Sequence, residues 1–138
     1  MNDDELRQAL NALDVYKSQL DALANQAQIF QVSLEEAIRS RETMKAFLNA
    51  KAGDDILVPV GAPSYVSAKA TGDNKAIVGI GSRISVEKDL PAAVEFMEQS
   101  VKEITDALKR TGDAINETEA TARNLSLAVQ QEYERRQQ

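Results

Sequence analysis

Two glycines, Gly79 and Gly81, lie one residue apart in the apolar stretch KAIVGIGSR, residues 75–83. Closely spaced glycines let a backbone wrap a phosphate group in nucleotide-binding loops. The dinucleotide fingerprint, however, requires a third glycine where Ile84 stands and a helix after it, whereas residues 83–87 alternate like a strand. No glycine is followed by Lys-Ser or Lys-Thr, so a P-loop is also absent. We therefore predict structural glycines, with Gly81 in a turn and Gly79 at a bend or a close approach between strands.

Carboxylates and lysines are the remaining candidates for acid–base chemistry. The sequence contains no cysteine and no histidine, which excludes thiolate and imidazole metal ligands, cysteine nucleophiles and any Ser-His mechanism. The acidic pairs at 35–36 and 54–55 could act in catalysis only within a pocket that shifts their pKa values and encloses a substrate. We interpret both pairs as solvated surface or loop residues. No enzymatic activity, metal site or cofactor is expected.

Composition limits the partners of this 138-residue chain, which is long enough for one domain. Its 16 basic and 22 acidic residues are interspersed and sum to a net charge of −6, so nucleic acid is not an expected partner. No basic and apolar leader opens the chain, and no apolar run approaches the roughly 20 residues of a membrane helix. We expect a soluble, cytoplasmic protein with no membrane contact. Three Phe, three Tyr and no Trp favour thin helical seams over a large core.

Residues 4–50 contain no proline or glycine, and their apolar residues recur at alternating steps of three and four. This spacing is typical of the a and d positions of a coiled-coil heptad, and it predicts one long helix. Arg41 interrupts the pattern and Leu48 resumes it. The a positions are Leu6, Leu13, Leu20, Ala27 and Leu34, and the d positions are Ala9, Tyr16, Leu23, Phe30, Ala37 and Met44.

A second heptad pattern follows Asp89 and predicts a helix over residues 90–136. Asp89 or Leu90 caps its start, because Pro91 is tolerated only in the first turn. The a positions are Val94, Val101, Leu108, Ile115, Ala122 and Val129, and the d positions are Met97, Ile104, Thr111, Thr118 and Leu125.

The two predicted helices have equal lengths of 47 residues, or about 70 Å each at 1.5 Å per residue. Equal lengths predict that they pair with each other in antiparallel orientation. In such a pair, facing residues have numbers with a constant sum, and a sum of 138 places Leu13 with Leu125 and Leu23 with Ile115. A slip of one heptad is the chief alternative register.

The segment between the helices, residues 56–87, reads as four short strands at 56–58, 65–70, 76–80 and 84–86. Turn residues at 61–64, 71–74 and 81–82 separate them and indicate two hairpins. An isolated hairpin is marginally stable, and bare strand edges invite pairing. We therefore predict that these strands meet those of other subunits, so that the protein is an oligomer.

Several motifs within this order of elements are more specific than the periodicity. They are LVPVG at 57–61, YVSA at 65–68, VGIG at 78–81, and VEK at 86–88, which leads into the second helix. With two long heptad helices around them, these motifs make the whole chain resemble the prefoldin family. The two hairpins resemble the α-type subunit, because β-type subunits have one hairpin.

The resemblance implies an ATP-independent co-chaperone, a hetero-hexamer of two α and four β subunits, which holds unfolded polypeptides between coiled-coil tips and delivers them to a group II chaperonin. It implies that the strands form a double β-barrel platform. The expected assembly residues are Ile56, Val58, Val60, Tyr65, Val66, Val78, Gly79, Ile80, Gly81, Ile84 and Val86. The antiparallel register places both chain ends at the tips, where the expected client-binding residues are Leu6, Leu10, Leu13, Leu125, Leu127, Val129 and Tyr133.

Two non-enzymatic functions are compatible with the heptads. One is the chaperone subunit, and the other is a coiled-coil scaffold or tether that uses the helices as a spacer and the strands as a dimerisation knot. The four-strand insert favours the chaperone, because a spacer needs no such sheet at its hinge. An enzyme is the least favoured class.

Overall fold

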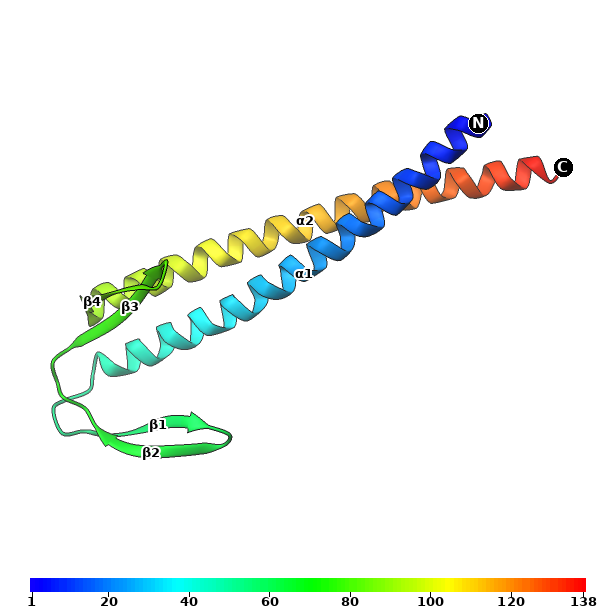
Figure 1. Ribbon diagram of the computed structural model, residues 1–138. Helices are drawn as coiled ribbons and strands as arrows, with labels where there is room; N and C mark the ends of the chain where they lie inside the picture. Colours follow the sequence, from blue (N-terminus) through cyan, green and yellow to red (C-terminus); the bar gives the residue numbers. More distant parts are fainter. The chain divides into compact units, whose positions relative to one another are not determined.

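The computed structural model describes all 138 residues, with two long helices and two small antiparallel hairpins between them (Figure 1). Helix α1 spans Asp3–Phe47 and helix α2 spans Leu90–Arg136. The first hairpin joins β1 (Asp55–Gly61) to β2 (Ser64–Lys69), and the second joins β3 (Lys75–Gly81) to β4 (Ile84–Asp89). The predicted fold class, a long antiparallel two-helix coiled coil with a central two-hairpin insert, is confirmed. Neither helix contains a stretch long and apolar enough to cross a membrane.

The chain forms two compact units. The helical unit contains residues 1–34 and 103–138, and the hairpin unit contains residues 35–102. Each unit has its own packed interior and its own set of exposed apolar residues.

The helical unit begins with a capping box at the start of α1. The Glu5 backbone N–H donates to Asn2 Oδ1 at 2.8 Å, and the Asn2 backbone N–H donates to Glu5 Oε2 at 3.0 Å. Three acidic residues in the first turn of α1 and two arginines in the last turn of α2 match the helix dipoles. These local signals explain why both helices keep their structure to the chain ends.

The two helices of this unit run antiparallel, with the first turns of α1 beside the last turns of α2 (Figure 1). Leu6, Ala9 and Val129 are buried together, and Leu13 and Leu125 pack against them. Ala9 with Val129 and Leu13 with Leu125 are the pairs whose numbers sum to 138, in agreement with the predicted register. The structure thus places the heptad residues in one shared seam.

Helix α1 ends in the hairpin unit at Phe47, three residues before the predicted end at residue 50. The Leu48 and Ala50 N–H groups donate to the carbonyls three residues earlier, at 3.2 and 3.1 Å. The Lys51 N–H then donates to the Asp54 carboxylate at 2.8 Å. These tighter turns replace the last helical turn because the chain must reverse before β1.

The two hairpins share one design. Each has a cross-strand ion pair at its open end, Lys69 to Asp55 at 2.6 Å and Lys75 to Asp89 at 2.7 Å. Three of these four residues lie beyond the strand ends predicted from apolar residues alone, so every strand except β2 is longer than expected. Gly81, predicted in the turn, is the last residue of β3, directly before the turn residues Ser82 and Arg83, and it has φ +106° at the bulge of the second hairpin.

Strand β4 continues directly into α2, with no loop between Asp89 and Leu90. The Leu90 N–H donates to the Asn74 carbonyl at 2.9 Å, which satisfies one of the free amides at the start of α2. Leu90, Ala93 and Val94 are buried and form the apolar start of the helix. The second hairpin lies along these first turns of α2 (Figure 1).

Candidate assembly and client-binding surfaces

The glycine pair and the aspartate pair considered for catalysis lie in strands and turns. Gly79 and Gly81 belong to β3, and the chain after them forms β4, so no helix start faces the glycine pair. Asp54 accepts the Lys51 N–H in a turn, and Asp55 pairs with Lys69 across the hairpin. No group of three or more acidic side chains in the chain could hold a metal ion. The glycine pair and the two aspartates therefore belong to the strands and turns of the hairpin unit.

The first hairpin exposes apolar side chains on both faces. The strand pairing places Val58 opposite Val66, with Ile56 and Ala68 beside them, so these residues share one face. Val58 is 42% exposed and Val66 54% exposed. The other face carries Leu57, Pro59 and Tyr65, of which Leu57 and Tyr65 are more than half exposed.

The second hairpin exposes one face and buries the other. Val78 is opposite Val86, and Lys88 shares their face because it is two residues from Val86. The Lys88 ammonium lies 5.6 Å from the centre of the Phe96 ring, which shows that this face is turned to α2. Val78 is accordingly 1% exposed, while its neighbour Ile77, on the opposite face, is 75% exposed.

The expected assembly residues therefore differ in accessibility. Six of them have large, substantially exposed side chains, Gly79 and Gly81 are also exposed, Ile56 and Val86 are half-buried, and Val78 is buried within its own chain. Leu57 and Ile77 are further exposed apolar residues that were not among the expected assembly residues. Their apolar character in strands with a period of two was the signal that could have found them. The six exposed residues are Val58, Val60, Tyr65, Val66, Ile80 and Ile84.

Gly79 has no crowded neighbour within the chain. A Cβ atom added at this position would meet no atom within 4 Å, and its φ is not positive. The predicted close approach to Gly79 is therefore not made by another strand of the same chain. Each two-stranded sheet also leaves both of its outer edges unpaired. Apolar faces and free edges together form a surface suited to pairing with further strands.

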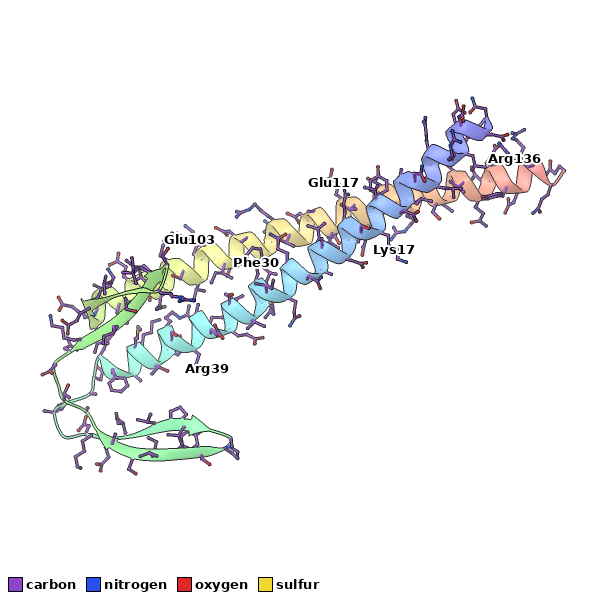
Figure 2. The ribbon with its side chains drawn as sticks, in the orientation of Figure 1. Lys17, Phe30, Arg39, Glu103, Glu117 and Arg136 are labelled. Atoms are coloured by element: carbon purple, nitrogen blue, oxygen red, sulfur yellow. The ribbon has the colours of Figure 1, made fainter.

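The ends of the two helices form a second candidate surface, and a buried carboxylate holds them together. Glu132 is 6% exposed and occupies the d position one heptad after Leu125. It accepts hydrogen bonds from Arg135 at 2.6 Å and from Arg136 at 2.8 Å. Arg136, which is labelled near the end of α2 in Figure 2, also donates to Asp3 of α1 at 2.7 Å, and the Met1 amino group lies 3.4 Å from Glu132.

These contacts alter the ionisation of Glu132. The hydrogen bonds from Arg135, and then from Arg136, hold the pKa of the Glu132 carboxyl far below its usual range despite the opposing effect of burial. Glu132 is therefore ionised throughout the physiological pH range. A charged layer closes the end of an otherwise uncharged seam in the helical unit, and sequence reasoning missed it because Glu132 interrupts the heptad pattern.

The expected client-binding residues divide into a buried and an accessible group. Leu6 and Val129 are buried in the seam, and Leu13 and Leu125 are partly buried against them. Leu10, Leu127 and Tyr133 are 38%, 51% and 45% exposed. The accessible group comes from both helices, so the paired ends present apolar side chains to solvent from α1 and α2.

Comparison with known proteins identifies the family. The family model for prefoldin subunits matches residues 4–135, nearly the whole chain. The chain belongs to the prefoldin family. It is 32% identical to prefoldin subunit alpha of Methanococcus maripaludis (strain C7) over 83% of this chain and 78% of that protein. It is 34% identical to prefoldin subunit alpha of Nitrosopumilus maritimus over 78% of this chain and 72% of that protein.

Solved prefoldin structures agree with the fold. A cryo-EM structure of filamentous PFD from Methanocaldococcus jannaschii matches with a TM-score of 0.66 and 25% identity, covering 85% of this chain and 97% of that one. A crystal structure of the prefoldin beta subunit from Thermococcus strain KS-1 shares the fold with a TM-score of 0.61 and 15% identity, covering 92% of this chain and 90% of that one. Membership of the prefoldin family supports a non-enzymatic co-chaperone role and assembly with prefoldin subunits.

Proposed function

We propose that this chain is the α-type subunit of an ATP-independent co-chaperone, an α2β4 hetero-hexamer with β-type prefoldin subunits in the cytoplasm. The complex holds non-native polypeptides and transfers them to a group II chaperonin. The observation that carries the proposal is the apolar surface of the hairpins, where eight large apolar side chains are exposed. A subunit that functions alone would expose this surface to aggregation, whereas neighbouring strands in a hexamer would cover it.

The assembly half of the proposal rests on strands and edges. Both hairpins have free outer edges, and the outer face of the second hairpin exposes Ile77 beside the small residue Gly79. Open space at Gly79 allows the backbone of a neighbouring strand or the side chain of a packed residue to come close. These features favour a sheet completed by other subunits over a simple dimerisation knot.

The client half of the proposal rests on the helix ends. Leu10, Leu127 and Tyr133 provide adaptable apolar contacts without requiring the seam to open. Each contact is weak, but several subunits present the same ends, so simultaneous contacts raise the effective affinity while each remains reversible. Such binding suits a complex that must release its client to a chaperonin.

The proposal is tested with the complex formed by co-expressing this chain with a β-type partner. Native mass spectrometry measures its stoichiometry, and light scattering measures aggregation of a diluted, denatured client without ATP. We expect a hexamer that suppresses aggregation. The double variant Leu10→Ser with Leu127→Ser should lose at least half of this suppression and keep the hexamer. The matched control Gln8→Ser with Gln131→Ser changes exposed residues at the same helix ends and should retain it.

The alternative function, a scaffold or tether, predicts a different result. A tether would assemble through its strands but leave client aggregation unchanged under conditions in which a known holdase lowers it. Deletion of residues 1–13 and 125–138 separates the two functions further. A chaperone loses aggregation suppression and retains the hexamer, whereas a tether loses no holding activity because it has none.

A further inference from the structure

Helix α1 carries a second heptad stripe on the face opposite its seam with α2. Moving two residues on from each seam position turns about 200° around the helix. Along residues 15–32 this outer face has three large apolar residues and three small or amide residues at steps of three and four. All six are exposed, and Val15, Ile29 and Val32 are 54%, 65% and 44% exposed. The stripe consists of Val15, Ser18, Ala22, Asn25, Ile29 and Val32.

The corresponding face of α2 is different. In the helical unit, the positions two residues after its seam residues are mostly charged, and they include Glu103, Arg110 and Glu117. A surface helix paired on one side normally has such a polar outer face. The outer stripe of α1, in contrast, contains no charged residue. Helix α1 therefore has a heptad stripe on each of two opposite faces, of which only one is covered by α2.

The outer stripe also contains a hollow with the geometry of a coiled-coil hole. Its lining consists of Val15, Ser18, Gln19 and Ala22, with Asp14 at the rim. These four residues have the spacing i, i+3, i+4 and i+7, which forms the hole that receives one side chain of a facing helix. An extended segment has a period of two and cannot follow the steps of three and four. The small side chains of Ser18 and Ala22 allow the backbone of a facing helix to come close.

The one amide in the stripe, Asn25, lies near its middle. A single Asn at a contact position of a coiled coil lowers stability but fixes the register of the pair, because its amide needs a polar partner on the facing helix. We therefore expect Asn25 to select a partner helix that has a polar residue at the matching contact position.

The charges beside the stripe indicate the partner. Asp14 and Asp21 lie along one flank, and Gln19 and Gln26 lie along the other. Neither aspartate forms an ion pair within the chain. A second copy of this chain would bring the same flanks and a net charge of −6, and so would gain no ion pair. A helix with cationic flanks would pair with both aspartates.

We propose that this outer stripe of α1 is a docking site for a cationic amphipathic helix, which packs along residues 15–32 as a third helix. The site is about 26 Å long, which corresponds to a partner helix of roughly 18 residues. It is separate from the helix-end residues assigned to clients, and thus goes beyond the proposed function. Its occupant is a polypeptide segment that is already helical, rather than an extended one.

Binding is measured by fluorescence anisotropy with the full-length chain and a labelled 21-residue peptide. The peptide has Leu at heptad positions a and d, except for one central Asn, and Lys at e and g. A scrambled peptide of the same composition, whose leucines share no face, is the control ligand. We expect binding of the heptad peptide only.

Two variants that add the same charge to the chain locate the binding face. Ala22→Lys should weaken binding of the heptad peptide about tenfold, because a charge enters the stripe and fills the hollow. Ala24→Lys should change it less than twofold. Ala24 is exposed on the same helix but lies well away from the stripe, so this variant is a matched control for charge and helix propensity.

The aspartates are tested separately. Asp14→Asn with Asp21→Asn should weaken binding about two- to fivefold at low salt and have no effect at 1 M salt, where exposed charge pairs are screened. Equal binding of both peptides, binding of neither, or equal effects of Ala22→Lys and Ala24→Lys overturns the proposal. Self-association that Ala22→Lys abolishes, without peptide binding, would assign the stripe to a second copy. The proposed client function is unaffected by these results, because the Leu10 and Leu127 variants test it on another surface.

Discussion

Val78 and Ile77 are neighbours in β3 whose side chains lie on opposite faces of the second hairpin, which makes them a matched pair for a stability experiment. Val78 is 1% exposed against the start of α2, and Ile77 is 75% exposed. We predict that Val78→Ala destabilises the hairpin much more than Ile77→Ala, although the second substitution removes more carbon atoms. The order of the two effects depends only on which face is turned to α2.

The expected magnitudes follow from burial. Val78→Ala removes two buried carbon groups, worth about 1.6 kcal/mol at about 0.8 kcal/mol each, and an unfilled cavity raises this to about 2.5 kcal/mol. Ile77→Ala removes three carbon groups that are only one-quarter buried, which amounts to about 0.6 kcal/mol. The loss of strand propensity on changing to Ala is similar in both variants and does not alter their order.

Amide hydrogen exchange of β3 and β4 in the full-length chain measures these effects locally. At about 1.4 kcal/mol for each tenfold change, Val78→Ala should accelerate exchange about 14- to 60-fold, and Ile77→Ala about threefold. In the proposed complex with a β-type partner, Ile77→Ala should have a larger effect, because we expect a neighbouring strand to cover the outer face. If Ile77→Ala exchanged faster than Val78→Ala in the chain alone, the assignment of the buried face would be wrong.

Three further predictions concern the ion pairs at the helix ends, the glycines and the helix register. The pKa of Glu132 in the folded chain is below its unfolded value of about 4.3, so the stabilisation that ionised Glu132 provides is complete above about pH 4.3 and is lost as the pH falls further. Protection of the amides of residues 3–9 against hydrogen exchange should therefore decrease on acidification. The decrease should be smaller in Glu132→Gln. Gly81→Val should lower the urea midpoint of unfolding, because Gly81 has φ +106°. Gly79→Val should leave that midpoint unchanged and impair assembly, because no atom of the chain lies near a Cβ added at Gly79. A lower midpoint in Gly79→Val would contradict this open space. Cysteines at Leu23 and Ile115 should form an intramolecular disulfide upon oxidation, and preferential linkage of Leu23 to a residue one heptad away would reject the register.

Much of the fold was predictable because its elements have simple periodicities. Heptad spacing located both helices, and the sum of 138 paired Leu13 with Leu125, both of which the structure places against one buried cluster. The last turn of α1 and the strand ends were not predicted as well. These boundaries depend on turn hydrogen bonds and on cross-strand ion pairs such as Lys75 with Asp89, which apolar patterns do not reveal.

The candidate surfaces were predictable only as regions. Exposure of Leu10 and Leu127 followed from their positions outside the heptad seam, and the structure agrees. Burial of Glu132 was not foreseen, because a carboxylate at a seam position is tolerated only when neighbours such as Arg135 and Arg136 satisfy it. Those contacts depend on side-chain geometry at the helix ends.

The sequence by itself determined which residues share a face, because the side-chain periods of helices and strands are fixed by backbone geometry. It thereby determined the two long helices, their antiparallel seam and the two hairpins. Only the tertiary structure decided which of two faces is covered. Val78 and Ile77 have nearly the same hydrophobicity, and only contact with α2 makes Val78 the buried residue of the two. The inner and outer stripes of α1 likewise have the same spacing, and only the inner stripe is covered by α2. The uncovered residues, Ile77 and the outer stripe, are left for a partner.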